Sequence, residues 1–154
     1  MTLEDALLQI RANITILSSG PHLQDVGDLD AILFGLLSLI KSYRELTNTT
    51  FVWKTQNPAH FQCDSYNAPT VGSTGYPIPP NLDKYHWNAL PDYDNYIRSN
   101  SSEARYGFKI LDMSPLYYRA DAHAGNGDCL HFCMPGPVDL FSILLLQMLY
   151  NGEL

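Results

Sequence analysis

The feature that most constrains the fold of this chain is an alternation of short β-branched segments with longer helical ones. Residues 13–17, Asn-Ile-Thr-Ile-Leu, form a compact β-branched run that predicts a buried strand. Further strands are predicted over residues 49–54 and 106–111. Because helical segments separate these strands, we expect an α/β layered domain with a parallel sheet, whose ligands bind at the carboxyl ends of the strands.

In the segments around the strands, apolar residues recur at the spacing of a helix. The second helix is expected to run from Asp28, its cap, to about Leu46. A later helix is expected to be interrupted before Pro91, because proline lacks the N–H that a helix interior needs. The predicted helices cover residues 3–11, 28–46 and 82–103, and a final amphipathic segment that begins at Pro137 and Asp139.

Two longer segments have the chemistry of loops. Residues 55–80 are rich in Pro, Gly, Asn, Ser and Thr, and a loop of this length in a compact domain is usually functional or poorly ordered. Residues 121–133 are predicted to be a second loop, in which acid, imidazole and thiol groups are concentrated. Both loops follow predicted strands, so we expect them at the carboxyl end of the sheet.

The composition bounds the class of protein. With 154 residues, 45% of them hydrophobic, the chain is long enough for one domain with a sizeable core. The net charge of -7 comes from scattered carboxylates, and no cluster of Lys and Arg is present, so we expect no nucleic-acid partner. The sequence contains neither Gly-x-Gly-x-x-Gly nor a Walker-type lysine loop, and we expect no cofactor.

Membrane association is expected only through an anchor outside this chain. The apolar stretches 31–40 and 140–149 are shorter than the roughly 20 residues that cross a bilayer. The N-terminus carries Glu4 and Asp5 where a signal peptide carries basic residues. If the protein is exported, we therefore expect its signal to lie outside this chain.

Three interpretations compete for the loop at 121–133. In the first, Asp128 accepts a hydrogen bond from His131 and fixes its tautomer, so that the other ring nitrogen can take a proton from a serine. In the second, His123, Cys129, His131 and Cys133 bind zinc. In the third, the acidic residues cap turns and the cysteines are structural. Spacing does not decide among the three.

The cysteines and sequons bear on the compartment. Cys63, Cys129 and Cys133 are compatible with free thiols, metal ligands or an incomplete disulfide framework. Three N-glycosylation sequons favour the secretory lumen, and they begin at Asn13, Asn48 and Asn100.

Three blocks of the sequence carry a family resemblance. Residues 128–139, Asp-Cys-Leu-His-Phe-Cys-Met-Pro-Gly-Pro-Val-Asp, are followed by an apolar helix. They resemble the closing Asp-x-x-His block of the plant trichome-birefringence-like polysaccharide O-acetyltransferases and their fungal and algal relatives, the PC-esterase group. Residues 14–22 resemble the family strand that ends in Asn-Thr-Gly-x-His-Trp, and residues 52–60 resemble its Arg-Thr-x-Ser-Pro-x-His strand end. The blocks occur in family order and cover most of the chain.

This resemblance implies an SGNH-like, flavodoxin-type fold, a three-layer arrangement around a parallel sheet. In the family, an N-terminal Gly-Asp-Ser supplies the nucleophile, and the Asp-x-x-His block supplies the acid and base, here Asp128 and His131. No Gly-Asp-Ser occurs in this sequence; Gly27-Asp28 is followed by Leu29 and opens a helix. We therefore expect a fragment or a degenerate copy: the C-terminal part of a single SGNH-like domain, with the N-terminal strands and nucleophile missing. In the strand order 2-1-3-4-5, the absent first strand would lie beside residues 14–17.

The resemblance also suggests residues that line the site. Ser18 stands where the family has Asn, Leu23 where Trp is usual, and Lys54 where Arg is usual. His22 and His60 can equally be hydrogen-bonded structural residues, and Lys54 can be solvated. The residues expected to line the oxyanion or substrate site are Ser18, Gly20, His22, Lys54 and His60.

The family setting implies a disulfide between Cys63 and either Cys129 or Cys133, with the remaining cysteine bonded outside this chain. It implies that an acyl group, with acetyl as the leading candidate, is transferred to or hydrolysed from a polysaccharide or glycan. The expected partners are this carbohydrate and an acyl donor. The expected compartment is the Golgi lumen or the extracellular space. The alternative is a catalytically inactive carbohydrate-binding or structural remnant, whose candidate sugar-stacking residues are Tyr66, Tyr76, Tyr85, Trp87, Tyr93, Tyr96, Tyr117 and Tyr118.

Overall fold

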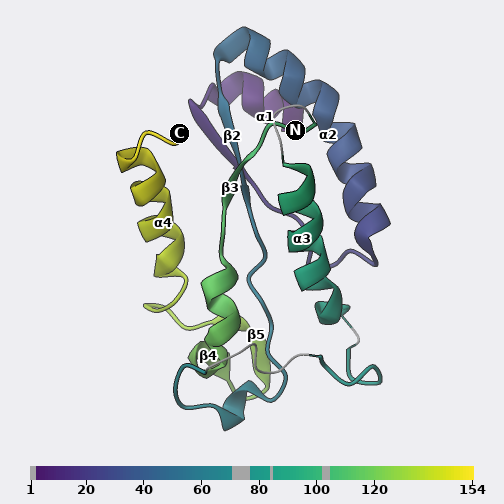
Figure 1. Ribbon diagram of the computed structural model, residues 1–154, viewed down its shortest axis with the longest axis vertical. Coiled ribbons are helices and arrows are strands. Elements are labelled where there is room, and N and C mark those ends of the chain that lie inside the picture. Colours follow the sequence, from purple (N-terminus) through teal and green to yellow (C-terminus); the bar gives the residue numbers. More distant parts are fainter. Residues whose placement is uncertain (1–2, 71–76, 84, 102–104) are drawn as a thin grey trace.

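The computed structural model describes residues 3–70, 77–83, 85–101 and 105–154 (Figure 1). Its helices are α1 (Leu3–Ile10), α2 (Val26–Thr47), α3 (Leu90–Asn100) and α4 (Asp139–Tyr150). Its strands are β1 (Ile14–Leu17), β2 (Thr50–Lys54), β3 (Lys109–Leu111), β4 (His123–Gly125) and β5 (Asp128–Phe132). Short 3-10 turns cover Cys63–Ser65, Trp87–Ala89, Ser114–Tyr118 and Ala120–Ala122.

The described strands form a parallel sheet and a separate hairpin. The sheet has the order β1-β2-β3, with Ile16 opposite Val52 and Val52 opposite Lys109. The second sheet is the antiparallel pair β4-β5. The predicted α/β fold with a parallel sheet is therefore confirmed, and β1 lies at one edge of that sheet.

Helices cover both faces of the parallel sheet, which gives three layers (Figure 1). Side chains along β2 alternate between the two faces, as strand geometry requires. Phe51 and Trp53 pack into the cluster formed with α1, α2 and α3. Val52 packs on the other face with Leu111 and with Leu144 of α4. Burial on both faces explains why residues 51–53 read as a continuous apolar run.

Two predicted boundaries differ from the structure for backbone reasons. The third strand begins at Lys109 and not at residue 106, because Gly107 adopts a left-handed φ of 65° that interrupts extended backbone. The second helix begins at Val26 and not at Asp28. Its cap is Asp25, whose Oδ1 accepts the N–H of Asp28 at 3.1 Å.

The predicted helix over residues 82–103 was placed too early. A 3-10 turn at Trp87–Ala89 leads into α3, which begins at Leu90. Pro91 does not interrupt this helix, because it stands in the first turn, where the missing N–H leaves no hydrogen bond unmade. The predicted end falls among residues 102–104, outside the described residues.

The segment 121–133 was predicted to be a loop, and this was wrong. It contains the hairpin β4-β5, which turns at Asn126 and Gly127. Both turn residues have positive φ values, 54° and 84°, as two-residue hairpin turns require. In the other predicted loop, residues 71–76 lie outside the described part of the chain. None of the described helices is long and apolar enough to cross a membrane.

Candidate active site

The Asp128 carboxylate organises the start of β5 and holds the His131 ring. Its Oδ1 atom accepts the backbone N–H groups of Leu130, at 3.3 Å, and His131, at 3.1 Å. The same carboxylate lies 3.0 Å from Nδ1 of the His131 ring. The backbone N–H of His131, and then its ring, lower the pKa of Asp128. The carboxylate is therefore ionised at neutral pH and holds the proton of His131 on Nδ1.

The other nitrogen of His131 is open to solvent. The side chain is 76% exposed, and Nε2 has no hydrogen-bond partner within the described residues. An imidazole with its proton fixed on Nδ1 presents a lone pair at Nε2, which can accept a proton from an incoming hydroxyl. This is the arrangement of a general base with its orienting acid.

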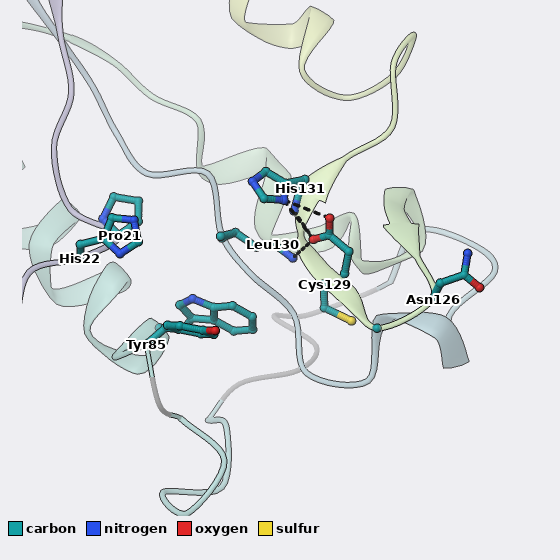
Figure 2. Close-up of a pocket in the computed structure, with 10 residues that line it drawn as sticks. Pro21, His22, Tyr85, Asn126, Cys129, Leu130 and His131 are labelled. Atoms are coloured by element: carbon teal, nitrogen blue, oxygen red, sulfur yellow. Dashed lines mark hydrogen bonds and ion pairs between the residues drawn. The ribbon is translucent and has the colours of Figure 1, made fainter.

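Two clefts meet at His131, and Pro21 and Leu130 also border both. The first, which we call the aromatic cleft, has a volume of about 510 Å³. Figure 2 shows His131 and Tyr85 bordering it from different elements, with Leu130 between them. The residues that line the aromatic cleft are Pro21, His22, Tyr85, Trp87, Asn126, Gly127, Asp128, Cys129, Leu130 and His131.

The second cleft, which we call the polar cleft, has a volume of about 390 Å³ and lies at the carboxyl ends of β1 and β2. Ser18, Ser19, Lys54, Gln56 and Asn57 contribute polar groups to it. The Lys54 ammonium donates to the carbonyl of Thr55 at 2.9 Å and to Oδ1 of Asn57 at 3.1 Å. Burial lowers the pKa of Lys54. These bonds fix a cation within the cleft that His131 borders.

Gln56 holds the loop after β1 in place. Its side-chain Nε2 donates to the carbonyl of Ser19 at 2.6 Å, and its backbone N–H donates to Asp94 of α3 at 2.9 Å. A Cβ on the buried Gly20 would lie only 2.4 Å from Oε1 of Gln56, so the absence of a side chain permits this approach. Burial raises the pKa of Asp94 to about 6.

His60 lies outside both clefts, in contrast to His22, which lines the aromatic one. It is 0% exposed, with Nδ1 2.7 Å from Nε2 of His123 and Nε2 3.0 Å from the carbonyl of Tyr117. Nδ1 of His123 lies 3.1 Å from the carbonyl of His131. The two imidazoles thus connect the segment after β2 with the backbone of His131.

Two of the four ligands of the zinc alternative, Cys129 and His123, are engaged elsewhere. Cys129 forms a disulfide with Cys63, one of the two pairings expected, while Cys133 is free and exposed. Both ring nitrogens of His123 face partners within the protein. In the described part of the chain, the one cluster with ligand spacing is Cys63, Asp64 and Cys129, whose two sulfurs are bonded to each other.

Several residues of the site were not singled out from the sequence. Asn126 lines the aromatic cleft, and Gln56 and Asn57 line the polar one. The Asn-Gly pair at 126 and 127 is a hairpin signal that would have placed Asn126 in a turn beside the strand. Gln56 and Asn57 come two and three positions after Lys54, the last residue of β2, and ligands bind at this end of the strands in parallel sheets.

The candidate sugar-stacking residues divide by position. Tyr93 is buried in the core, and Tyr76 lies outside the described residues. Tyr85 and Trp87 line the aromatic cleft, and Tyr118 is exposed but lines neither cleft. Tyr66, Tyr96 and Tyr117 are partly buried and line neither cleft.

A comparison with family models matches residues 19–148 to PC-Esterase, described as the GDSL/SGNH-like acyl-esterase family found in Pmr5 and Cas1p. The match covers most of the chain and includes α2, α3 and the strands β2 to β5, whereas β1 precedes it. It therefore includes the aromatic cleft and the Asp128–His131 pair.

Several curated plant proteins are similar to the chain. It is 26% identical over 145 residues to protein trichome birefringence-like 13 of Arabidopsis thaliana, covering 85% of this chain and 35% of that protein. It is 30% identical over 114 residues to xyloglucan O-acetyltransferase 4 of Populus trichocarpa, covering 62% and 27%. With xyloglucan O-acetyltransferase 1 of Arabidopsis thaliana it shares 28% over 142 residues, covering 77% and 31%. The chain spans about a third of the length of the curated relatives it matches.

Proposed function

The chain belongs to the PC-esterase family of GDSL/SGNH-like acyl-esterases, and from this premise we propose that its protein transfers or hydrolyses an acetyl group on a polysaccharide or glycan. One observation carries the proposal. The Nδ1 atom of His131 is held by Asp128 while Nε2 opens onto two clefts. The names of the xyloglucan O-acetyltransferase relatives support a carbohydrate acceptor and acetyl as the group moved.

In the proposed reaction, His131 acts first as base and then as acid. Nε2 takes the proton of a serine hydroxyl as the serine oxygen bonds to the acyl carbonyl carbon. When the tetrahedral intermediate collapses, the protonated ring returns this proton to the departing oxygen, which leaves an acyl-serine. A sugar hydroxyl or a water then attacks the acyl carbon, again giving its proton to Nε2. When this second tetrahedral intermediate collapses, the bond between the acyl carbon and the serine oxygen breaks, and the serine oxygen takes the proton back from Nε2. Asp128 keeps the tautomer fixed and stabilises the imidazolium.

We propose that this serine comes from a part of the protein outside these 154 residues, and that the chain is the C-terminal part of a single SGNH-like domain. The edge position of β1 supports this, because a further parallel strand can pair there. An apolar groove of about 290 Å³ between α1 and β1, bordered by Leu7, Ile10 and Ile14, offers a place for that strand's side chains. Such a strand would end near Ser18.

We assign the polar cleft to the acyl group. The Ser18 hydroxyl and the backbone N–H of Ser19, which precedes Gly20 in the loop, are proposed to donate hydrogen bonds to the developing oxyanion, with the Lys54 cation nearby. Gly20 itself lines neither cleft. His22, on the other side of Pro21, is proposed to contact substrate in the aromatic cleft. His60 has no proposed contact with substrate, because it is buried outside both clefts.

The compartment is proposed to be the secretory lumen, in the Golgi, or the extracellular space. The disulfide between Cys63 and Cys129 supports an oxidising environment. Asn13 and Asn48, which begin two of the sequons, are exposed at the amino-terminal end of the sheet. Expression in a eukaryotic secretory host should yield glycans that an N-glycosidase removes, and Asn48→Gln should lose one of them.

The test of the function compares this chain with the full product of its gene. Each is incubated with an acetyl donor ester and a neutral oligosaccharide, and mass spectrometry follows both the acetylated sugar and released acetate. Turnover by the full product, but not by the 154-residue chain, supports the proposal. A full product that contains no serine block and shows no turnover would instead support the inactive carbohydrate-binding remnant.

A further inference from the structure

Tyr85 and Trp87 form a stacked aromatic pair at the mouth of the aromatic cleft. Their ring centroids lie 5.6 Å apart, and the planes of the rings meet at 27°. Tyr85 is 46% exposed, while Trp87 packs partly buried against the core of the α2 and α3 layer. Apolar surface gathered in a groove is typical of a ligand-binding site, and the exposed Tyr85 ring lies in the cleft that His131 also lines.

Hydrogen bonds hold the backbone at Trp87 in place. The backbone N–H of Trp87 donates to Oδ1 of Asp83 at 2.6 Å, and the N–H of Asn88 donates to Oδ2 of the same carboxylate at 3.2 Å. The Asn88 amide exchanges two hydrogen bonds with the backbone of Ile78, at 2.7 and 2.8 Å. The Trp87 ring is therefore carried by backbone that is already hydrogen-bonded before any ligand arrives, which lowers the entropic cost of binding.

The lining of the cleft selects for a neutral ligand with an apolar face. Pro21, Leu130 and the two rings supply apolar surface, while His22, Asn126 and Asp128 supply hydrogen-bonding groups. No lysine or arginine occurs among the described residues that line it, and Asp128 contributes negative charge. The cation Lys54 lines the polar cleft instead. A volume of about 510 Å³ lies within the range of small-ligand sites.

A pyranose ring has the matching chemistry, because its C–H groups form an apolar face and its hydroxyls form a polar rim. We propose that Tyr85 and Trp87 form a subsite that stacks a neutral sugar ring of the glycan and directs one of its hydroxyls towards Nε2 of His131. The stacking is inferred from the residues that line the cleft. The role of the directed hydroxyl, as acceptor of the acyl group, rests on the proposed function. Aromatic stacking of this kind contributes beyond simple burial.

Binding is tested by NMR titration of the full gene product with a xyloglucan oligosaccharide, a xylan oligosaccharide and an oligogalacturonide. We expect the neutral sugars to bind more tightly than the anionic one. Tyr85→Ala should weaken binding of the neutral sugars by about 3- to 10-fold. The matched control is Tyr118→Ala, since Tyr118 is 47% exposed and lines neither cleft, and its affinity should stay within about twofold of the wild type.

A second substitution tests the other ring of the pair. Because Trp87 also packs against the core, it is replaced with another aromatic residue, so that the protein still folds. Trp87→Phe keeps an aromatic ring and should bind sugar with an affinity between those of the wild type and Tyr85→Ala. Equal affinities for Tyr85→Ala and the wild type, or preference for the anionic oligosaccharide, would overturn the subsite.

The subsite and the proposed function fail in different ways. If neutral sugar binds and depends on Tyr85 but no acetyl group is moved, the subsite stands and the function fails. If acetyl is moved with a KM that Tyr85→Ala leaves unchanged, the function stands and the subsite fails. His131→Ala should abolish turnover while changing the affinity for sugar by less than about twofold.

Discussion

The Nδ1 atom of His60 lies 2.7 Å from the Nε2 atom of His123. This is the middle one of three contacts in a row, because the other ring nitrogen of each histidine faces a backbone carbonyl. Two neutral imidazoles carry two N–H hydrogens between them, which is one too few for three contacts. Two fully protonated rings would place N–H against N–H and break the central contact. Two neutral rings can therefore make two of the three hydrogen bonds and a singly protonated pair all three, whereas two charged rings cannot keep the central contact.

Acid should destabilise the fold through this pair. Burial, and then the charge of His60, lower the pKa of His123 to about 4, while Asp121 and Asp128 oppose this shift. Because this pKa lies below the unfolded value of about 6.5, stability is complete above pH 6.5 and falls as the pH drops towards 4. Urea unfolding should show that the stability advantage of the wild type over His123→Gln shrinks by about 2–3 kcal/mol between pH 7 and pH 4. An unchanged difference would contradict the pair's role.

Asp94 should have the opposite pH dependence. Burial raises its pKa to about 6, above the unfolded value of about 3.9. Its contribution to stability is therefore complete below pH 3.9 and is lost as the pH rises through 6. When the pH rises from 4 to 7, the free energy of unfolding of Asp94→Asn should rise by roughly 2–3 kcal/mol relative to that of the wild type, as measured by urea unfolding. His123 and Asp94 both titrate between pH 4 and 7. The comparison of the wild type with His123→Gln is therefore best repeated with Asp94→Asn introduced into both of them.

Gly20 should not tolerate a side chain. An alanine Cβ would lie 2.4–2.7 Å from the end of the Gln56 side chain, which is buried and bonded to Ser19. We expect Gly20→Ala to lower the free energy of unfolding by about 1–3 kcal/mol. The control is Gly35→Ala in α2, where no atom lies within 4 Å of the new Cβ. It should raise stability by up to about 1 kcal/mol, because alanine is the better helix former. Equal effects in both variants would contradict the close approach of Gln56.

The disulfide should contribute strongly to stability, because it joins residues separated by 66 positions. The chain-entropy model gives about 4 kcal/mol for a loop of this length. Replacing both Cys63 and Cys129 with serine should therefore lower the melting temperature sharply under non-reducing conditions. Cys133→Ser should change the free energy of unfolding by less than about 0.5 kcal/mol, because that thiol is free and exposed. A double variant as stable as the wild type would rule out this crosslink in the folded protein.

Local patterns in the sequence were sufficient to predict the layers of the fold. The β-branched run 13–17 and the apolar run 51–53 each form a strand, because residues within one segment determine their own extended backbone. Boundaries were less accurate where one residue changed the backbone, as Gly107 does before β3. The hairpin was not predicted, because residues 123–132 contain no Val, Ile or Thr to mark its strands and only Asn126 and Gly127 indicate its turn.

The sequence predicted only the contact of the site that joins residues close together in the chain. Asp128 and His131 are three positions apart, so spacing and family resemblance together were enough to predict their contact, which the structure has at 3.0 Å. Gln56 and Asp94 are separated by 38 positions, and His60 and His123 by 63. Their contacts depend on how separate segments pack, and no periodicity in a single sequence encodes that.

The most direct test of the central claim measures kcat for acetyl transfer by the full gene product in variants of the Asp128–His131 pair. His131→Ala and Asp128→Asn should each lower kcat by at least about 10³-fold, because one removes the base and the other its tautomer. His86→Asn is the control, since His86 lines neither cleft and asparagine tolerates its left-handed φ of 57°. It should retain wild-type turnover. Wild-type kcat in His131→Ala would contradict the assignment of this pair as the acid and base of the enzyme.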